Sequence, residues 1–237
     1  MSLAEVAERL GMSRSTTHRY MTTLVELGYL EQTRTRRYRL GLRPLDVGMS
    51  ALRATGLRDI GHLYLDRLRH DTGLTAGLAV LSDSSVLYVD RVQGRDVNMG
   101  VGGSPTISIG VRLPAHCTSV GKVLLAYLPE EVRRQVLAEI TLTKNTGHTI
   151  TRRKQLEEQL AEIATLGFAV SDEEFYSGMR SIAAPIRKGE TVIAALDLTT
   201  HETITAGVLT ETYLRLLDVV TEQISQILDE SKGGSCP

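Results

Sequence analysis

The chain lacks several features that would place it in particular classes of protein. Its 237 residues include no Trp, two Phe and two Cys. Cys117 and Cys236 are too few for a disulfide framework, so we expect a cytoplasmic protein. We expect no signal peptide and no membrane partner, because no apolar run approaches the roughly twenty residues that span a bilayer. The core must then rely on Leu, Val, Ile and Ala, and the length suits two modest domains.

The first forty residues predict two short helices joined by a tight turn. Ser2 and Glu5 have the spacing of a capping box, in which each side chain accepts a hydrogen bond from the other residue's backbone amide. Gly11 can adopt the left-handed conformation that ends a helix, and Ser13 can cap a second helix running to Leu27. The predicted apolar face of the first helix comprises Leu3, Val6, Ala7 and Leu10. Two helices so closely connected are typical of a helix-turn-helix, so nucleic-acid binding is the leading hypothesis.

The second helix divides into an apolar side and a polar side. The residues predicted to pack against the first helix are Thr17, Tyr20, Met21, Leu24 and Leu27. The polar residues gather near the start of the helix, which in a major groove meets the base edges. The candidates for contact with DNA on this helix are Ser13, Arg14, Ser15, His18, Arg19 and Thr22.

A basic hairpin is predicted to follow, with strands at 29–32 and 38–40. Its loop contributes three further candidates for contact with phosphates, Arg34, Arg36 and Arg37.

The charge of the chain is unevenly distributed. The stretch from Met1 to Arg43 holds eight Arg and four Glu, a net charge of +4. The whole chain has a net charge of −1, so the remainder carries −5. A basic end on an acidic body favours a protein that meets double-stranded DNA at that end.

These motifs resemble the IclR family of bacterial transcription regulators. The resemblance begins with the run from Ser2 to Tyr20 and continues in Leu113-Pro-Ala-His-Cys-Thr-Ser-Val-Gly-Lys and Asp172-Glu-Glu-Phe-Tyr-Ser-Gly-Met-Arg-Ser. It covers nearly the whole chain. The motifs His116-Cys-Thr-Ser and Arg180-Ser-Ile-Ala are most similar to those of the branch that controls protocatechuate, 4-hydroxybenzoate and β-ketoadipate catabolism.

The resemblance implies a ligand-responsive regulator that binds an operator as a dimer or a dimer of dimers, senses a small organic acid and needs no cofactor. It also implies a further helix ahead of the one that begins at Ser2. We expect that the native protein has residues before Met1, because the caps and the apolar periodicity of this region are intact.

The rest of the chain predicts an α+β body with a largely antiparallel sheet. We expect a DNA-binding domain at 1–41, a linker helix at 42–56 and an effector and oligomerisation domain at 57–237. Strands are predicted at 75–81, 86–92, 97–101, 168–172, 179–187 and 192–199, and helices at 57–71, 117–127, 129–140, 151–166 and 208–228. The resemblance implies a winged helix-turn-helix at the first domain and a GAF-like sensor fold for the last.

The resemblance also supplies candidate effector-binding residues. Ser119, Val120 and Gly121 would offer backbone amides at a helix start, which suits a carboxylate. Ser181 stands where some members have Cys, and Asp197 stands where others have Ser. An acid at position 197 would disfavour a small anion placed against it, or would accept from a ligand hydroxyl. The remaining candidates are Ser171, Asp172, Met179, Thr199 and, for pairing with an anion, Arg112 and Arg180, each of which could instead form a structural salt bridge.

An enzyme with a vestigial DNA-binding end is the alternative hypothesis. His116 and Cys117 precede a predicted helix, whose N-terminus could lower the pKa of a thiol nucleophile. Adjacent residues rarely place an imidazole against a sulfur, however, and no flanking motif of a cysteine hydrolase is present. The histidines show no HxxxH spacing and the cysteines no CxxC spacing, so no metal site is expected.

Overall fold

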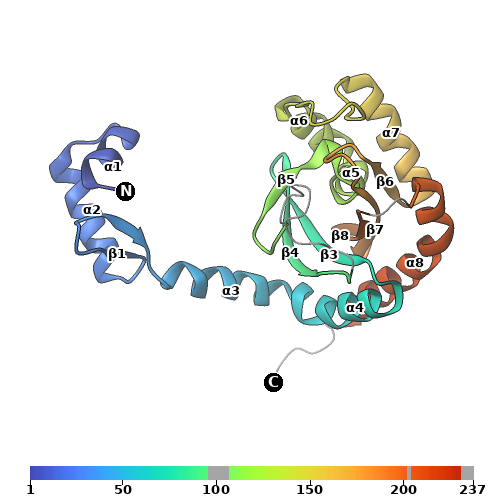
Figure 1. Cartoon of the computed structure of the whole chain (residues 1–237), viewed down its shortest axis with the longest axis horizontal. Coiled ribbons are helices and arrows are strands. Elements are labelled where there is room, and N and C mark those ends of the chain that lie inside the picture. Colours follow the sequence, from blue (N-terminus) through green and yellow to red (C-terminus); the bar gives the residue numbers. More distant parts are fainter. Residues whose placement is uncertain (96–106, 202–203, 231–237) are drawn as a thin grey trace. The chain divides into compact units, whose positions relative to one another are not determined.

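The computed structural model describes residues 1–95, 107–201 and 204–230 (Figure 1). The strand predicted at 97–101 lies outside the described residues. The chain divides into two compact units, Met1–Thr55 and the part that begins at Gly56. The described helices include none that is long and apolar enough to cross a membrane.

The first unit is a winged helix-turn-helix followed by a helix. Its elements are α1 (Leu3–Leu10), α2 (Arg14–Glu26), β1 (Leu30–Gln32), β2 (Tyr38–Leu40) and α3 (Arg43–Thr55). The capping box is confirmed, since the Ser2 amide donates to Glu5 Oε2 at 2.8 Å and the Glu5 amide donates to Ser2 Oγ at 3.3 Å. Gly11 ends α1 with φ of 62°, and Ser13 Oγ accepts from the Thr16 amide to cap α2. Helix α3 groups with this unit.

Fewer residues of α2 are buried against α1 than the sequence predicts. Thr17 and Met21 are buried, whereas Tyr20, Leu24 and Leu27 are exposed, so the prediction was wrong for these three residues. Successive residues are rotated by about 100° around a helix, which places Tyr20 well to one side of Met21. The eight residues of α1 cover a single stripe of α2 and leave the neighbouring stripe open.

In the described residues, the second unit is built on an antiparallel sheet of six strands. The antiparallel arrangement and five of the strands are as predicted, whereas the strand at Arg112–Pro114 was not predicted. The strands are β3 (Thr75–Ser82), β4 (Ser85–Val92), β5 (Arg112–Pro114), β6 (Ala169–Asp172), β7 (Arg180–Lys188) and β8 (Thr191–Thr200). Their order across the sheet is β5-β4-β3-β8-β7-β6. The central strands are rich in Val, Ile, Leu and Ala, and residues of both faces are buried, so helices must cover both sides.

Helices α4 (Leu57–Thr72) and α8 (Ala206–Glu230) pack on one face of this sheet, which we call the outer face (Figure 1). Helix α5 (Ser119–Ala126) packs on the other, inner face, and α7 (Arg153–Leu166) packs against α5. Helix α6 (Glu130–Glu139) lies between α5 and α7 in the sequence. Side chains alternate between the faces along each strand. Leu78 therefore meets α4 at Gly61, whereas Ala79 faces α5.

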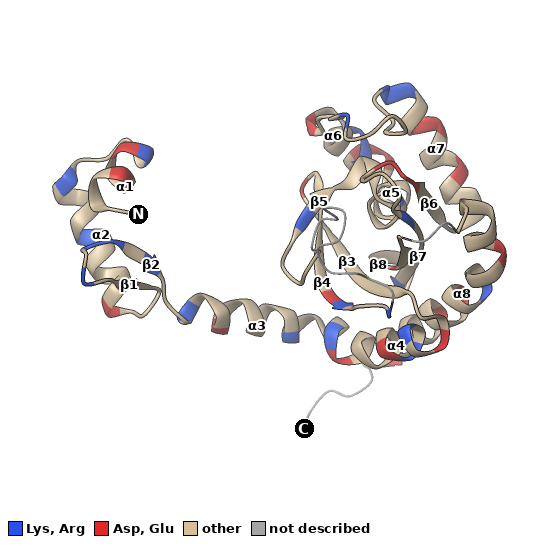
Figure 2. Ribbon diagram, viewed as in Figure 1, with Lys and Arg blue, Asp and Glu red and all other residues tan. Residues whose placement is uncertain are grey.

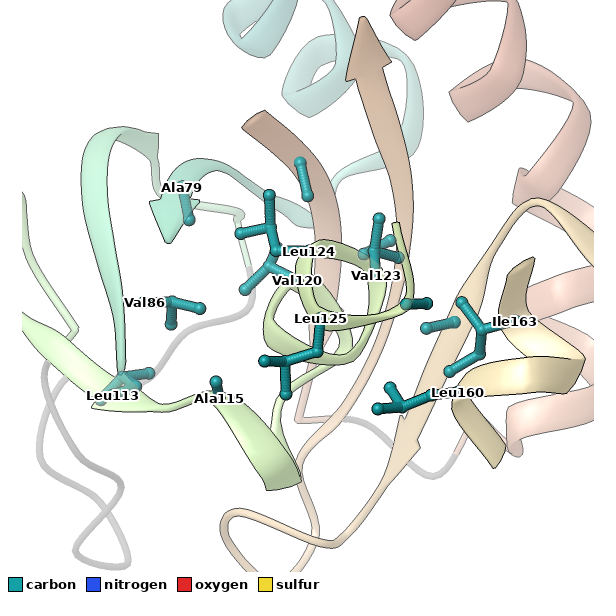
Figure 3. Packing of buried hydrophobic residues seen from close by; sticks show 14 of the residues in the cluster. Ala79, Val86, Leu113, Ala115, Val120, Val123, Leu124, Leu125, Leu160 and Ile163 are labelled. Carbon is teal, nitrogen blue, oxygen red and sulfur yellow. The ribbon is translucent and has the colours of Figure 1, made fainter. Parts of the chain in front are cut away.

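Helix α5 is the centre of the larger core (Figure 3). All eight of its residues are buried, and Val120, Val123 and Leu124 belong to one apolar cluster with the inner face of the sheet. The helix is shorter than predicted: a 3₁₀ turn occupies Ala115–Cys117, and Thr118 is extended. A Cβ on Gly121 would lie 2.3 Å from the carbonyl oxygen of Ala115, so only glycine permits this close turn.

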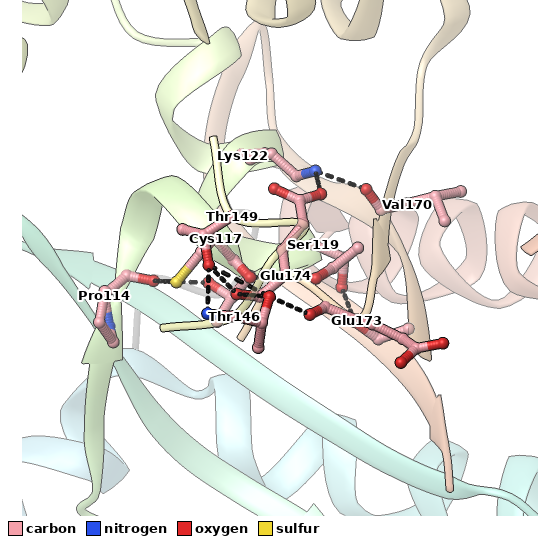
Figure 4. Close-up of polar contacts among 12 residues, drawn as sticks. Pro114, Cys117, Ser119, Lys122, Thr146, Thr149, Val170, Glu173 and Glu174 are labelled. Carbon is pink, nitrogen blue, oxygen red and sulfur yellow. Dashed lines mark hydrogen bonds and ion pairs between the residues drawn. The ribbon is translucent and has the colours of Figure 1, made fainter. Parts of the chain in front are cut away.

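One charged side chain lies inside this core. Lys122 is fully buried and donates to Glu174 Oε1 at 2.5 Å and to the carbonyl oxygen of Val170 at 2.6 Å (Figure 4). Glu174 is itself buried, and its Oε2 has no hydrogen-bond partner among the described residues. Burial lowers the pKa of Lys122 and raises that of Glu174, while each charge opposes the shift of the other. The pair joins α5 to β6 and to the segment after it.

Removing one partner of this ion pair is expected to leave a buried charge without its counterion. Lys122→Met should lower the free energy of unfolding by about 3–5 kcal/mol, measured by urea denaturation. The double variant Lys122→Met/Glu174→Leu should recover most of that loss, since neither charge remains. Equal stability of the single variant and the parent would show that the pair does not hold α5 in place.

Candidate functional site

A row of polar side chains crosses the inner face of the sheet beneath α5. In the strand register Ser171 lies opposite Ser181, and Ser181 lies opposite Thr199. One step further along, Asp197 lies between Ala183 on β7 and Gly77 on β3. Directly opposed residues share a face, so these side chains point to the same side as α5. We call Ser119, Ser171, Ser181, Asp197 and Thr199 the inner-face cluster.

The start of α5 is hydrogen-bonded to this cluster (Figure 4). Ser119 Oγ lies 2.7 Å from Ser181 Oγ, which joins α5 to β7. Ser171 Oγ donates to the carbonyl oxygen of Cys117 at 3.0 Å, which joins the 3₁₀ turn to β6. The three serines are buried. The structure thus brings together the helix start and the polar strand positions that the sequence predicted.

Asp197 is the charged member of the cluster and is 2% exposed. Its Oδ2 accepts from the Tyr88 hydroxyl at 3.1 Å and from Thr199 Oγ1 at 2.8 Å. Its Oδ1 has no hydrogen-bond partner among the described residues. Burial raises the pKa of Asp197, and the positive charge of Arg91 and the two donors oppose that rise. A Cβ on Gly77 would lie 2.4 Å from Oδ1, so the glycine makes room for the carboxylate.

Sequence reasoning missed Tyr88 and Arg91, which the register places beside Asp197. Tyr88 lies opposite Ala79, and Arg91 lies opposite Gly77, both on the inner face. The Arg91 guanidinium carbon lies 5.8 Å from the centre of the Tyr88 ring, and Arg91 donates to the carbonyl oxygen of Ile107 at 2.9 Å. A bulge in the β3–β4 pairing at Leu78 and Ala79 sets this arrangement, and no sequence signal marked it.

Three predicted residues lie away from the inner-face cluster. Arg112 is exposed on β5, opposite Leu87, and so points to the outer face. Asp172 and Arg180 lie opposite each other, one position from the serines and hence on the other face of the sheet. Arg180 Nε donates to Asp172 Oδ1 at 2.6 Å, and the guanidinium also pairs with Glu173. For Arg180 the structure shows the salt bridge that was the alternative to an effector contact. Val120, Gly121 and Met179, which were also predicted, are buried.

Cys117 has the surroundings of a structural cysteine. Its side chain is fully buried, and Asn145 Nδ2 donates to Sγ at 3.2 Å. Burial raises the pKa of the thiol to about 12, so the nucleophilic thiolate is scarce at neutral pH. His116 Nε2 lies 3.1 Å from the carbonyl oxygen of Thr143, not against the sulfur. In the described part of the chain, no three His, Cys, Asp or Glu side chains gather as a metal site.

The first unit carries the second candidate surface (Figure 2). Figure 2 shows basic positions, in blue, on α2 and on the hairpin. The predicted residues Arg14, Ser15, His18, Arg19 and Thr22 are all exposed on α2. Ser13 is also exposed, but its hydroxyl accepts from the Thr16 amide at 3.1 Å, so its role is to cap α2. A helix start with exposed polar side chains suits base edges in a major groove.

The basic loop of the hairpin is ordered by Thr33. The Arg37 amide donates to Thr33 Oγ1 at 3.1 Å, and the Arg36 amide donates to the Thr33 carbonyl oxygen at 2.9 Å. Arg36 adopts φ of 56°, which closes the turn. Arg34, Arg36 and Arg37 are exposed, and Arg37 lies 3.5 Å from Glu5. The loop therefore presents cations on a fixed backbone.

Two known family models match the chain, one in the first unit and one mainly in the second. Residues 1–34 match the IclR helix-turn-helix domain, and residues 49–226 match the C-terminal domain of the bacterial transcriptional regulator IclR. The chain belongs to the IclR family. It is thus a DNA-binding transcriptional regulator with an effector-binding C-terminal domain, and not an enzyme. The surroundings of Cys117 do not support the alternative hypothesis of an enzyme, because the thiol is buried, burial raises its pKa to about 12, and His116 contacts the Thr143 carbonyl oxygen instead.

Several IclR-family proteins are similar over most of the chain. The HTH-type transcriptional regulator XynR of Escherichia coli is 31% identical over 84% of this chain and 78% of its own. The Pca regulon regulatory protein of Pseudomonas putida is 31% identical over 92% of this chain and 74% of its own. The crystal structure of an IclR homolog complexed with 4-hydroxybenzoate from Microbacterium hydrocarbonoxydans is 26% identical, with a TM-score of 0.80 over 96% of this chain and 91% of that one.

The structure predicts that Cys117 resists alkylation in the folded protein. Iodoacetamide at neutral pH should modify Cys117 only after unfolding in urea, because burial and the raised pKa suppress the thiolate. A Cys236→Ser variant leaves Cys117 as the single thiol, and mass spectrometry follows the label. Rapid labelling of the folded variant would contradict a buried, protonated Cys117.

Proposed function

We propose that this regulator controls a catabolic operon in response to a small organic acid that binds at the inner-face cluster. The observation that carries the proposal is the buried polar cluster at the start of α5, in which Asp197 Oδ1 has no hydrogen-bond partner among the described residues, since an unpaired buried polar atom is costly. The start of α5 adds the backbone amides of Ser119, Val120 and Gly121 and the positive end of a helix dipole. That end suits the carboxylate of an effector.

The class of acid that we propose is aromatic or dicarboxylic. In support, the Pca regulon regulatory protein and the homolog complexed with 4-hydroxybenzoate are similar to this chain over most of its length. Gly77, Ala79, Ala183 and Ala195 give the inner face small side chains around the cluster. We propose that the ring of an aromatic acid would pack against these small side chains.

On the DNA side, we propose that Arg14, Ser15, His18 and Arg19 read base edges, while Arg34, Arg36 and Arg37 contact phosphates. The protein would act in the cytoplasm as a dimer or a dimer of dimers on a palindromic operator, since a two-fold protein matches two half-sites. Exposed apolar side chains on α3, such as Leu45 and Val47, support self-association through that helix.

The effector proposal is tested by a thermal-shift screen of benzoates and dicarboxylates. A ligand at a hundredfold its dissociation constant should stabilise the domain that binds it by about 2.7 kcal/mol. Ser181→Leu should abolish the shift, because it fills the cluster beside Ser119. Thr165→Leu, an exposed change on α7, serves as the matched control and should keep the shift. If no acid shifts the parent protein, the proposed effector class is wrong.

The DNA proposal is tested with a duplex selected by the protein from a random library. Arg14→Ala and Arg19→Ala should each weaken binding about tenfold or more, by loss of base or phosphate contacts. The affinity should also fall steeply as the salt concentration rises. Arg134→Ala, an exposed arginine of α6, should leave the affinity unchanged. Equal affinities of all the variants would place the DNA contacts elsewhere.

A further inference from the structure

Asp197 gives one end of the inner-face cluster a chemistry that the serines do not have. We propose that the effector carries, besides its carboxylate, a hydrogen-bond donor such as a hydroxyl group, which Asp197 Oδ1 accepts. The proposal rests on the proposed function, because it concerns the ligand of the same cluster. It narrows the effector from small organic acids in general to hydroxy acids.

The first support is the unequal environment of the two carboxylate oxygens. Oδ2 already has the Tyr88 hydroxyl at 3.1 Å and Thr199 Oγ1 at 2.8 Å. Oδ1 has none among the described residues, although Asp197 is 2% exposed. Buried polar atoms are nearly always paired, so each exception calls for an explanation. A donor brought by the ligand would pair Oδ1 without disturbing Oδ2.

The second support is that the surrounding residues fix the carboxylate in place. Two donors on Oδ2 hold the orientation of the side chain, and Gly77 supplies the space that Oδ1 occupies. Arg91, on the same face, offsets the negative charge of Asp197. An acceptor that is held before the ligand arrives loses little conformational freedom on binding, which favours selectivity for a donor.

The third support is the separation of the two ends of the cluster. An effector carboxylate set directly against Asp197 would meet a like charge, so it must lie at the α5 end, near Ser119 and Ser181. Ser181 and Asp197 lie on adjacent strands, one step apart along the same face, a diagonal of roughly 7–8 Å. The carboxylate and the donor must therefore lie at opposite ends of a small molecule.

Matched pairs of acids test this inference by titration calorimetry on the full chain. The pairs are benzoate with 3- and 4-hydroxybenzoate, and succinate with malate. In each pair that binds, the hydroxy acid should bind tenfold or more tightly than its partner, as expected for a hydrogen bond to a charged group. Asp197→Ser should reduce this ratio several-fold.

Tyr88→Phe provides a second variant in case Asp197→Ser does not fold. It removes one donor from Oδ2 and keeps the ring, so the ratio should fall while the protein stays folded. Equal binding of both acids of each pair to the parent protein would overturn the inference and leave the proposed function intact. An affinity ratio between the hydroxy acid and its partner that stays unchanged in both variants would also overturn the inference and leave the proposed function intact. Failure of every acid to bind would overturn the inference and the proposed effector together.

Discussion

The buried ion pair between Lys122 and Glu174 is the interaction on which the effector domain depends. It fixes α5 against β6, and α5 in turn carries the serine that meets β7. The segment after β6 is tied down from other sides as well, since Thr149 Oγ1 donates to the Glu174 carbonyl oxygen at 2.7 Å. Charged groups are rarely placed in a core unless they are paired, and this pair joins two elements far apart in the sequence.

Glycines at two positions of the effector domain make room for the close approach of backbone and polar groups. Gly121 allows α5 to follow directly on the 3₁₀ turn, and Gly77 allows the Asp197 carboxylate to lie over β3. Both glycines have ordinary negative φ, so what matters is the missing side chain and not a special backbone conformation. On the inner face the polar side chains lie toward the start of β7 and the end of β8, and apolar side chains such as Ala79, Ala183 and Ala195 follow along the strands.

Local signals in the sequence predicted much of the fold. The capping box at Ser2, the glycine at position 11 and the alternating apolar strands depend on neighbouring residues, and the structure confirms them. The face on which a residue lies depends on strand register, which is a long-range property. For that reason Arg112, exposed on the outer face, was grouped with the effector residues, whereas Tyr88 and Arg91 were missed. The burial of Lys122 could not be predicted from the sequence either, because its partner Glu174 is fifty-two residues away.

The central claim is that occupancy of the inner-face cluster changes DNA binding by the first unit. Linkage requires that an effector and DNA change each other's affinity by the same factor. The direct measurement is the dissociation constant of the selected duplex with and without a saturating acid that binds the protein. We predict a change of at least fivefold in the parent protein and none in Ser181→Leu. The same dissociation constant with and without the bound acid would contradict the account.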